Sequence, residues 1–189
     1  MKTEIYKMSA LELSEAFKDK TLSPVEAINS VLERIKNIDE KLNAYVFIDE
    51  DLAIKQAKES EIRWNNASPK SKIDGVPTAI KDLLLTKDWP TMRGSKTVNK
   101  NTDWKDDAPV TARLKESGAV LIGKTTTPEF GHKGTTQSPL TGITRNPWNV
   151  SRTSGGSSGG SSSSVSSGMG PLAIGTDGGG SVRIPCSFT

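Results

Sequence analysis

The tract between residues 151 and 168 constrains this chain most strongly. Fifteen of its eighteen residues are Ser or Gly, the exceptions being Arg152, Thr153 and Val165. Side chains this small form either a flexible linker or a stretch where the backbone comes very close to another group. The apolar run Pro171–Ile174 follows the tract, and no domain-sized segment stands beyond it for a linker to reach. The sequence therefore favours close packing, with a flexible linker as the alternative.

Helical patterns alternate with short apolar segments along the chain. Ser23, Pro24 and Glu26 fill the positions of an N-cap, a first helical residue and a capping-box partner. This alternation predicts an α/β layered fold. The expected helices begin after Ser9, run from Ser23 to about Lys36, from Asp51 to about Trp64 and from Pro109 to Glu116, and the expected strands are Tyr45–Ile48, Ala119–Gly123 and Pro171–Gly175.

A further buried-strand pattern runs from Gly75 to Leu85 and is interrupted by two charges, Lys81 and Asp82. On a strand these two side chains point to opposite faces, so Asp82 need not pair with Lys81. Burial would then lower the lysine pKa from about 10.4 towards about 7–8, where the neutral amine can act as a base. The alternative is a strand-end lysine in water.

Charge and composition exclude several classes of protein. The balance of 25 Lys and Arg against 22 Asp and Glu gives a net charge of +3 without a dense basic run, which argues against a nucleic-acid or anionic-membrane surface. The single Cys186 cannot form an internal disulfide, and the first twenty residues lack the order of a signal peptide. No stretch approaches the roughly 20 apolar residues that span a bilayer. We expect a soluble, cytoplasmic protein with no nucleic-acid or membrane partner.

Few residues are available for catalysis. The only histidine, His132, would have to serve a Ser-His-Asp triad, although a lone histidine is as readily a surface or loop residue. One His and one Cys cannot supply the ligands of a zinc site, and no phosphate-loop or dinucleotide-turn spacing occurs. What remains is a serine activated by a base other than histidine, for which Lys81 is the candidate.

Three separated blocks resemble the amidase-signature hydrolases. They are Gly75–Asp82 (GVPTAIKD), Gly155–Gly160 (GGSSGG) and Gly175–Pro185 (GTDGGGSVRIP). Residues 24–44 and 118–128 are also similar to the amino-terminal half of that family. The resemblance implies an α/β fold with a mixed β-sheet core covered by helices. It also implies hydrolysis of a small-molecule carboxylic amide with no metal or organic cofactor.

By that resemblance Ser181 is the nucleophile that forms an acyl-enzyme, and Lys81 is the base. Ser157, which the family holds after a cis peptide bond, passes the proton between them. The oxyanion hole is expected at the glycines that precede Ser181, because glycine lets backbone N–H groups approach a reacting oxygen. The oxyanion-hole residues are Gly178, Gly179 and Gly180; the supporting residues are Ser158, Thr176, Asp177 and Arg183; and Gly131 and His132 are expected beside the substrate channel.

Two departures from the family affect the prediction. Six serines, among them Ser161–Ser164, stand where relatives have an alanine-rich helix. The resemblance also covers only about the first half of family members. We therefore expect a single, incomplete domain, with a helical amino-terminal region at about 1–70 and a catalytic core at about 71–189.

The predicted activity is that of an acylamide amidohydrolase, and two alternatives stay open. One is the glutaminase component of a tRNA-dependent amidotransferase, where we would expect Gln at the position of Ile184 and a Met-Asp-Glu-Phe-like segment before residue 130. Ile184 and the segment Thr125–Phe130 (TTTPEF) look more like stand-alone amidases. The other is a non-catalytic binding module or inactive fragment. A homodimer is left open.

Overall fold

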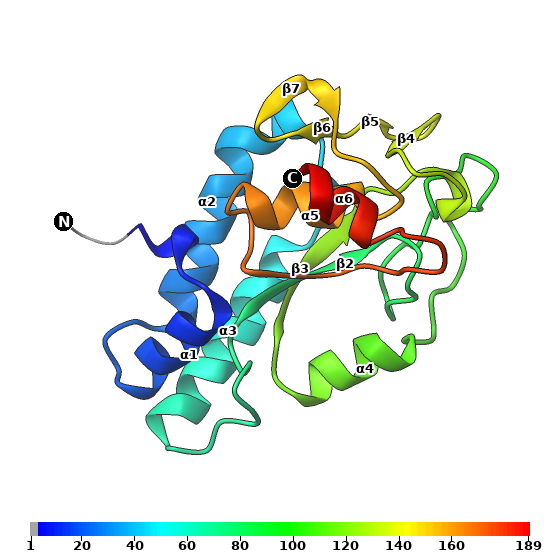
Figure 1. Ribbon diagram of the computed structural model, residues 1–189. Coiled ribbons are helices and arrows are strands. Elements are labelled where there is room, and N and C mark those ends of the chain that lie inside the picture. Colours follow the sequence, from blue (N-terminus) through cyan, green and yellow to red (C-terminus); the bar gives the residue numbers. More distant parts are fainter. Residues whose placement is uncertain (1–3) are drawn as a thin grey trace.

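A four-stranded sheet lies at the centre of the molecule, with helices around it (Figure 1). The computed structural model describes residues 4–189, so residues 1–3 of the predicted helical region lie outside the described residues. The helices are α1 (Ala10–Lys18), α2 (Pro24–Leu42), α3 (Glu50–Asn65), α4 (Pro109–Glu116), α5 (Gly159–Ser166) and α6 (Arg183–Phe188), with 3-10 turns at Ile5–Lys7 and Glu129–Gly131. The strands are β1 (Tyr45–Ile48), β2 (Pro77–Lys81), β3 (Val120–Thr125), β4 (Gln137–Ser138), β5 (Gly142–Ile143), β6 (Arg145–Asn146), β7 (Asn149–Thr153) and β8 (Leu172–Ile174).

The central sheet is mixed, as the resemblance implies. Its strand order is β1-β3-β2-β8, with β1 antiparallel to β3 and with β2 parallel to both β3 and β8. The register of β2 against β3 shifts between Thr78 and Ile80, so that Ile80 pairs with Lys124 and Lys81 with Thr125. Parallel strands inside a layered fold are covered on both faces, which is why every residue of β2 and β3 is buried.

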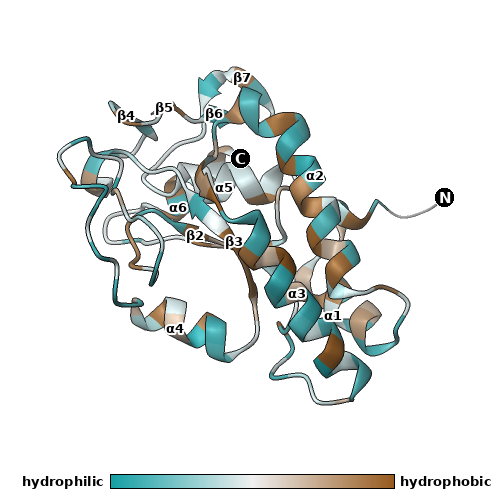
Figure 2. Cartoon of the chain, turned by 180° about the vertical axis from the view of Figure 1, so that it is seen from behind, coloured by the Kyte–Doolittle hydropathy of each residue, from teal (hydrophilic) through white to brown (hydrophobic). Residues whose placement is uncertain are grey.

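Helices α2 and α3 cover one face of the sheet. Their apolar side chains form a buried cluster with Ala79, Val120 and Ile122 of the sheet. The α2 helix starts at the predicted capping box, because Ser23 Oγ accepts the Glu26 N–H and the Glu26 carboxylate accepts the Ser23 N–H. Its hydrophobic and hydrophilic stripes are visible in Figure 2.

Helix α4 and the long connection after β2 cover the opposite face. Ile80 and Leu121 pack there with Leu114 of α4 and with Trp89. The Trp89 indole N–H donates to Asp49 Oδ2 at 2.8 Å, which ties the connection to the start of α3. The two faces thus have different coverings: regular helices on one, and mostly loop on the other.

Several sequence expectations are wrong in detail. The α2 helix continues to Leu42 instead of ending near Lys36, and Asn43 then closes it in the left-handed conformation. The strand β2 ends at Lys81, so the apolar residues 83–85 form a turn and not a strand. The short hairpins β4–β5 and β6–β7 and the helix α6 have no counterpart in the expectations, because they lack a sustained apolar period.

The Ser/Gly tract is packed and is not a flexible linker. Its residues 154–161 are buried, and α5 lies within it. The serine hydroxyls that replace an alanine-rich helix have partners: Ser164 Oγ bonds to the Tyr45 hydroxyl at 2.8 Å, and Ser163 Oγ donates to Arg145 O at 3.0 Å. Glycine is required at the start of α5, since a Cβ on Gly160 would lie only 2.6 Å from Thr126 O.

We expect Gly160→Ala to destabilise the fold by about 1–3 kcal/mol, because the added methyl group must push the Thr126 backbone away. The free energy of unfolding from urea titration measures this. Gly134→Ala is the matched control, because a Cβ there would meet only Ile184 Cδ1, at 3.6 Å. Equal stabilities of the two variants would contradict the close approach.

Candidate active site

Lys81 is the centre of the site. It is the last residue of β2, and none of its surface is exposed. Its Nζ donates to three hydroxyls, at 2.7 Å to Ser157 Oγ, 2.8 Å to Ser158 Oγ and 2.8 Å to Thr176 Oγ1. The buried-lysine interpretation is therefore confirmed, and the alternative of a strand-end lysine in water is wrong.

The surroundings of Lys81 make its amine less basic. Burial lowers the Lys81 pKa to about 8, and the negative charge of Asp177 partly opposes that shift. The neighbouring Asp82 carboxylate lies on the opposite side of the sheet, where its ion-pair partner is Lys124 at 3.7 Å. Among residues 4–189 Lys81 has no ion pair, so an uncharged amine is accessible near neutral pH.

The three hydroxyls around Lys81 are not equivalent. Ser158 Oγ donates to Thr176 O at 3.2 Å and accepts the Thr176 N–H at the same distance, so its proton is already committed. For Ser157 Oγ, Lys81 is the hydrogen-bond partner within residues 4–189. Ser157 can therefore give its proton to a neutral Lys81, whereas Ser158 is suited to holding the amine in place.

Ser157 is held by its backbone. The Gly156–Ser157 peptide bond is cis, as the resemblance implies. Thr136, which the sequence analysis missed, braces this stretch: its Oγ1 donates to Gly155 O at 2.8 Å and accepts the Gly159 N–H at 3.0 Å. No local pattern could have identified Thr136, since it lies fifteen residues before the tract in an irregular segment.

The main chain of Ser181 lies next to Ser157 and Ser158. The Ser181 carbonyl accepts the Ser158 N–H at 3.0 Å. Within residues 4–189 the Ser181 hydroxyl forms no hydrogen bond, so the predicted bond to Ser157 Oγ is not made in this conformation. The structure brings Lys81 and Ser157 into contact and places Ser181 next to them.

Asp177 and Arg183 hold the turn that carries Ser181. The Asp177 carboxylate accepts the N–H groups of Gly180, Val182 and Arg183, at 2.6, 3.0 and 3.2 Å. The Arg183 guanidinium adds two bonds at 3.0 and 2.9 Å, and together with the backbone N–H groups it holds the Asp177 pKa well below its usual range. Both side chains therefore fix the backbone on either side of Ser181, and their supporting role in catalysis stays a prediction.

The glycine turn supplies fewer free N–H groups than predicted. The Gly180 N–H donates to Asp177 Oδ1 at 2.6 Å, so in this conformation it is not free to donate to another oxygen. Gly178 and Gly179 are exposed, and a Cβ on either would meet nothing within 4 Å. The candidate oxyanion donors are therefore the N–H groups of Gly178, Gly179 and Ser181.

The two residues expected beside the substrate channel differ in position. Gly131 adjoins the site: a Cβ there would lie 3.3 Å from Ser157 Oγ and 2.6 Å from Leu83 Cδ1. His132 is exposed, and its Nδ1 bonds to Glu129 O at 2.6 Å, which fixes the local turn. The structure thus places Gly131, and not the His132 ring, against Ser157.

Other features of the described residues do not add to this site. A cavity of about 380 Å³ opens between α5, β8 and α6; Ser158 and Val182 line it, whereas Lys81, Ser157 and Ser181 do not. Residues 4–189 contain no group of three or more His, Cys, Asp or Glu side chains arranged to hold a metal ion. Within the same range no helix is long and apolar enough to cross a membrane.

Comparisons with known proteins identify the family. The Amidase family model matches residues 26–189. The chain is 41% identical over 187 residues to the A subunit of the glutamyl-tRNA(Gln) amidotransferase of Thermobifida fusca (strain YX), covering 98% of this chain and 37% of that protein. A bacterial aryl acylamidase belonging to the amidase signature enzymes superposes with a TM-score of 0.92 at 35% identity, covering 97% of this chain and 38% of that one. The peptide amidase from Stenotrophomonas maltophilia superposes with a TM-score of 0.88 at 28% identity, covering 95% and 38%.

The chain belongs to the amidase-signature family, which confirms the prediction from the three sequence blocks. It spans less than two fifths of the length of these relatives.

We expect the Lys81 ammonium to titrate with a pKa of about 8, because burial penalises its charged form. Carbon-13 NMR of lysine Cε in the folded protein measures this, and the resonance is assigned by its loss in Lys81→Met. The assignment is needed because burial also lowers the pKa of Lys124. A Lys81 midpoint above about 10, the ordinary range of lysine, would contradict the site as described.

Proposed function

We propose that this chain carries the catalytic residues of a hydrolase that cleaves a carboxylic amide C–N bond through an acyl-enzyme on Ser181. The observation that supports this most directly is the fully buried Lys81, which is surrounded by hydroxyls and lacks a carboxylate partner. A buried ammonium without a carboxylate partner is costly to keep charged, so these surroundings favour the neutral amine. A base has to lose its proton, and neutral partners permit that.

In the proposed acylation step, neutral Lys81 accepts the Ser157 proton while Ser157 Oγ accepts the Ser181 proton. The Ser181 oxygen then bonds to the amide carbonyl carbon. This step requires the Ser181 side chain to come within hydrogen-bonding distance of Ser157 Oγ. The bond between the Ser158 N–H and the Ser181 carbonyl already holds the two backbones together.

The carbonyl oxygen becomes an oxyanion in this step, and the N–H groups of Gly178, Gly179 and Ser181 are the proposed donors to it. The protons then return through Ser157 to the nitrogen of the leaving group, and the C–N bond breaks with release of ammonia or an amine. Water attacks the acyl-enzyme by the reverse proton path and frees a carboxylate. Losing one donor of an oxyanion hole typically lowers the rate by about 10²–10³-fold.

We expect a fluorophosphonate to add once to the protein, through a bond between Ser181 Oγ and phosphorus with loss of fluoride. Intact-mass analysis should find the adduct in the wild type and none in Ser181→Ala. The labelling rate should fall by about 10²-fold or more in Lys81→Ala, in the range of lost general-base catalysis, and should rise with pH to a plateau above about 8 as Lys81 loses its proton.

Ser157→Ala and Ser158→Ala form a matched pair for this experiment. Both hydroxyls accept from Lys81, but only the Ser157 proton is uncommitted, so Ser157→Ala should lower the labelling rate far more than Ser158→Ala. Equal losses in the two variants would contradict the proposed relay. Labelling that persists in Ser181→Ala would contradict the nucleophile.

A second candidate function is that of the glutaminase component of an amidotransferase. It is favoured by the curated relatives, since eight of them, at 36–41% identity, are A subunits of glutamyl-tRNA(Gln) amidotransferases. Ile184 lies against the glycine turn before Ser181, because a Cβ built on Gly180 would be 3.0 Å from Ile184 Cδ1. An apolar side chain at the nucleophile turn suits an apolar acyl group better than the acyl group of glutamine, which carries a charged amino and carboxylate group.

We therefore expect a higher kcat/KM for ammonia release from an aliphatic or aryl amide than from L-glutamine. Replacing Ile184 with glutamine should raise the rate with L-glutamine relative to the rate with the apolar amide. The polar groups of bound L-glutamine then have a hydrogen-bond partner at this position. If kcat/KM for L-glutamine equals or exceeds the value for every apolar amide tested, the glutaminase function is favoured instead.

A further inference from the structure

We propose that the buried Lys124–Asp82 pair is a positioning element for the proposed reaction, holding the segment 83–94 so that the turn 128–131 lies against Ser157. This inference rests on the proposed function. It concerns a second buried lysine, which the mechanism does not use.

Lys124 is as completely buried as Lys81, but its partners differ. Its Nζ donates to Leu84 O and to Thr91 Oγ1, both at 2.7 Å, and lies 3.7 Å from Asp82 Oδ1. All of these partners belong to the connection after β2, which contains no helix or strand of its own. Lys124 therefore fixes a loop to the sheet.

The register irregularity in β3 makes this contact possible. Leu121 and Lys124 both face the α4 side, because the shift between Thr78 and Ile80 inserts one extra residue into β3. Thr125 then faces α5, where its Oγ1 bonds to Ser161 Oγ at 2.7 Å. The irregular stretch contains Gly123. A Cβ at this position would lie only 2.9 Å from Ile48 Cα of β1, so a larger residue would not fit.

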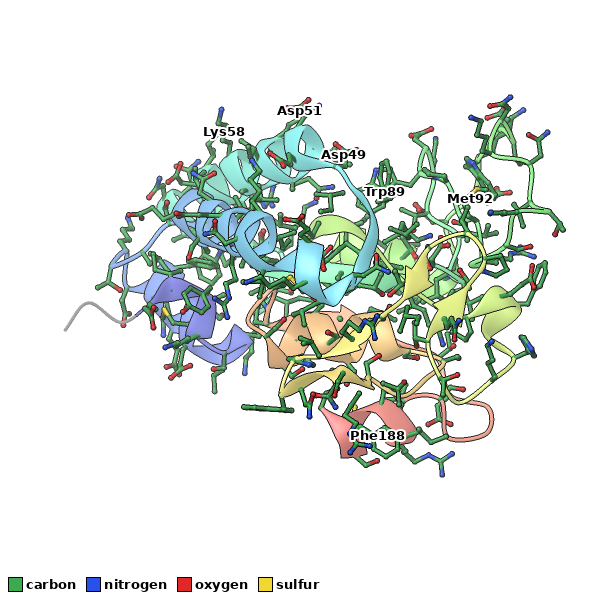
Figure 3. All side chains as sticks on the ribbon, turned by 90° about the horizontal axis from the view of Figure 1, so that it is seen from above. Asp49, Asp51, Lys58, Trp89, Met92 and Phe188 are labelled. Atoms are coloured by element: carbon green, nitrogen blue, oxygen red, sulfur yellow. The ribbon has the colours of Figure 1, made fainter. Side chains whose placement is uncertain are left out.

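Asp82 connects the catalytic strand to the same loop. It follows Lys81 directly, and its N–H donates to Thr125 O at 3.0 Å. Its carboxylate accepts the N–H groups of Met92 at 3.1 Å and Gly94 at 3.3 Å. Figure 3 labels Met92 and, on the same loop, Trp89. The pair thus clamps both ends of the segment 83–94: Leu84 through Lys124, and residues 92–94 through Asp82.

The far end of this segment holds the turn beside Ser157. Arg93 O accepts the Phe130 N–H at 2.8 Å. Gly94 packs so tightly on this turn that a Cβ would lie 2.5 Å from Thr127 O. The near end completes the contact, because Leu83 Cδ1 packs against Gly131, which in turn adjoins Ser157 Oγ.

A buried ion pair is weak evidence for stability, because desolvation offsets much of the attraction. The Lys124–Asp82 pair therefore needs another role, and its contacts indicate a positioning one. Every polar side-chain atom of the pair bonds to the loop or to its own partner. If the segment 83–94 moves, the turn 128–131 beside Ser157 moves with it. Small displacements of reacting groups lower a reaction rate by large factors.

The test compares wild type with Lys124→Met and with the double variant Asp82→Asn/Lys124→Met, which leaves no unpaired buried charge. We expect both to label with fluorophosphonate about 10- to 100-fold more slowly at saturating reagent, with the apparent dissociation constant of the reagent changed less than threefold. A purely structural role would lower the fraction of molecules that label and leave the rate of that fraction unchanged. Lys124→Arg, which keeps the charge, should recover part of the rate.

Amide hydrogen exchange provides a readout that does not depend on activity. In Lys124→Met the N–H groups of Met92 and Phe130 should exchange faster, whereas the β2 amides should not. Lys36→Met, which removes an exposed ion pair with Glu50, is the control and should change neither readout.

The outcomes separate this inference from the proposed function. A double variant that folds and labels at the wild-type rate, or unchanged exchange at Phe130 in Lys124→Met, overturns the positioning role. A wild-type protein that never labels overturns the proposed function, and the exchange at Phe130 then decides the positioning role alone.

Discussion

The contact of Lys81 with three hydroxyls is the interaction on which the rest of the site depends. A buried ammonium is costly, and most buried lysines recover part of that cost from a carboxylate. Here the nearest carboxylate in sequence, Asp82, is turned away to Lys124, and Asp177 is engaged by Arg183 and by backbone N–H groups. Each acid near the lysine therefore has another partner, which is what leaves the amine free to exist uncharged.

The sheet separates two kinds of buried lysine. On the α5 face Lys81 meets only neutral oxygens, and on the α4 face Lys124 meets a carboxylate, a carbonyl and a hydroxyl. Strand alternation sends Lys81 and Asp82 to opposite faces, and the irregular register of β3 brings Lys124 to the Asp82 side. One strand end thus carries the candidate base on one face and the attachment of its neighbouring loop on the other.

Much of this arrangement could be predicted from the sequence, where local rules decide it. The capping boxes at Ser9 and Ser23 and the end of α4 before Gly118 follow from side-chain hydrogen bonds and a left-handed glycine. The partners of Lys124 could not be predicted, because they depend on a register shift between strands that are distant in sequence. Nor could the engagement of the Gly180 N–H by Asp177, since a glycine turn in sequence does not show which N–H groups are already bonded.

The Ser/Gly tract shows why composition alone misleads. Its glycines are explained by contact: Gly159 and Gly160 lie against Thr136 and Thr126, and a methyl group at either would overlap them. Its serines are explained by burial beside polar groups, because alanine could not satisfy the carbonyls and hydroxyls that surround α5. In a flexible linker the same residues would serve for their conformational freedom. Here the small side chains let a helix begin within hydrogen-bonding distance of a buried lysine, so the property that makes a linker flexible is what makes this packing close.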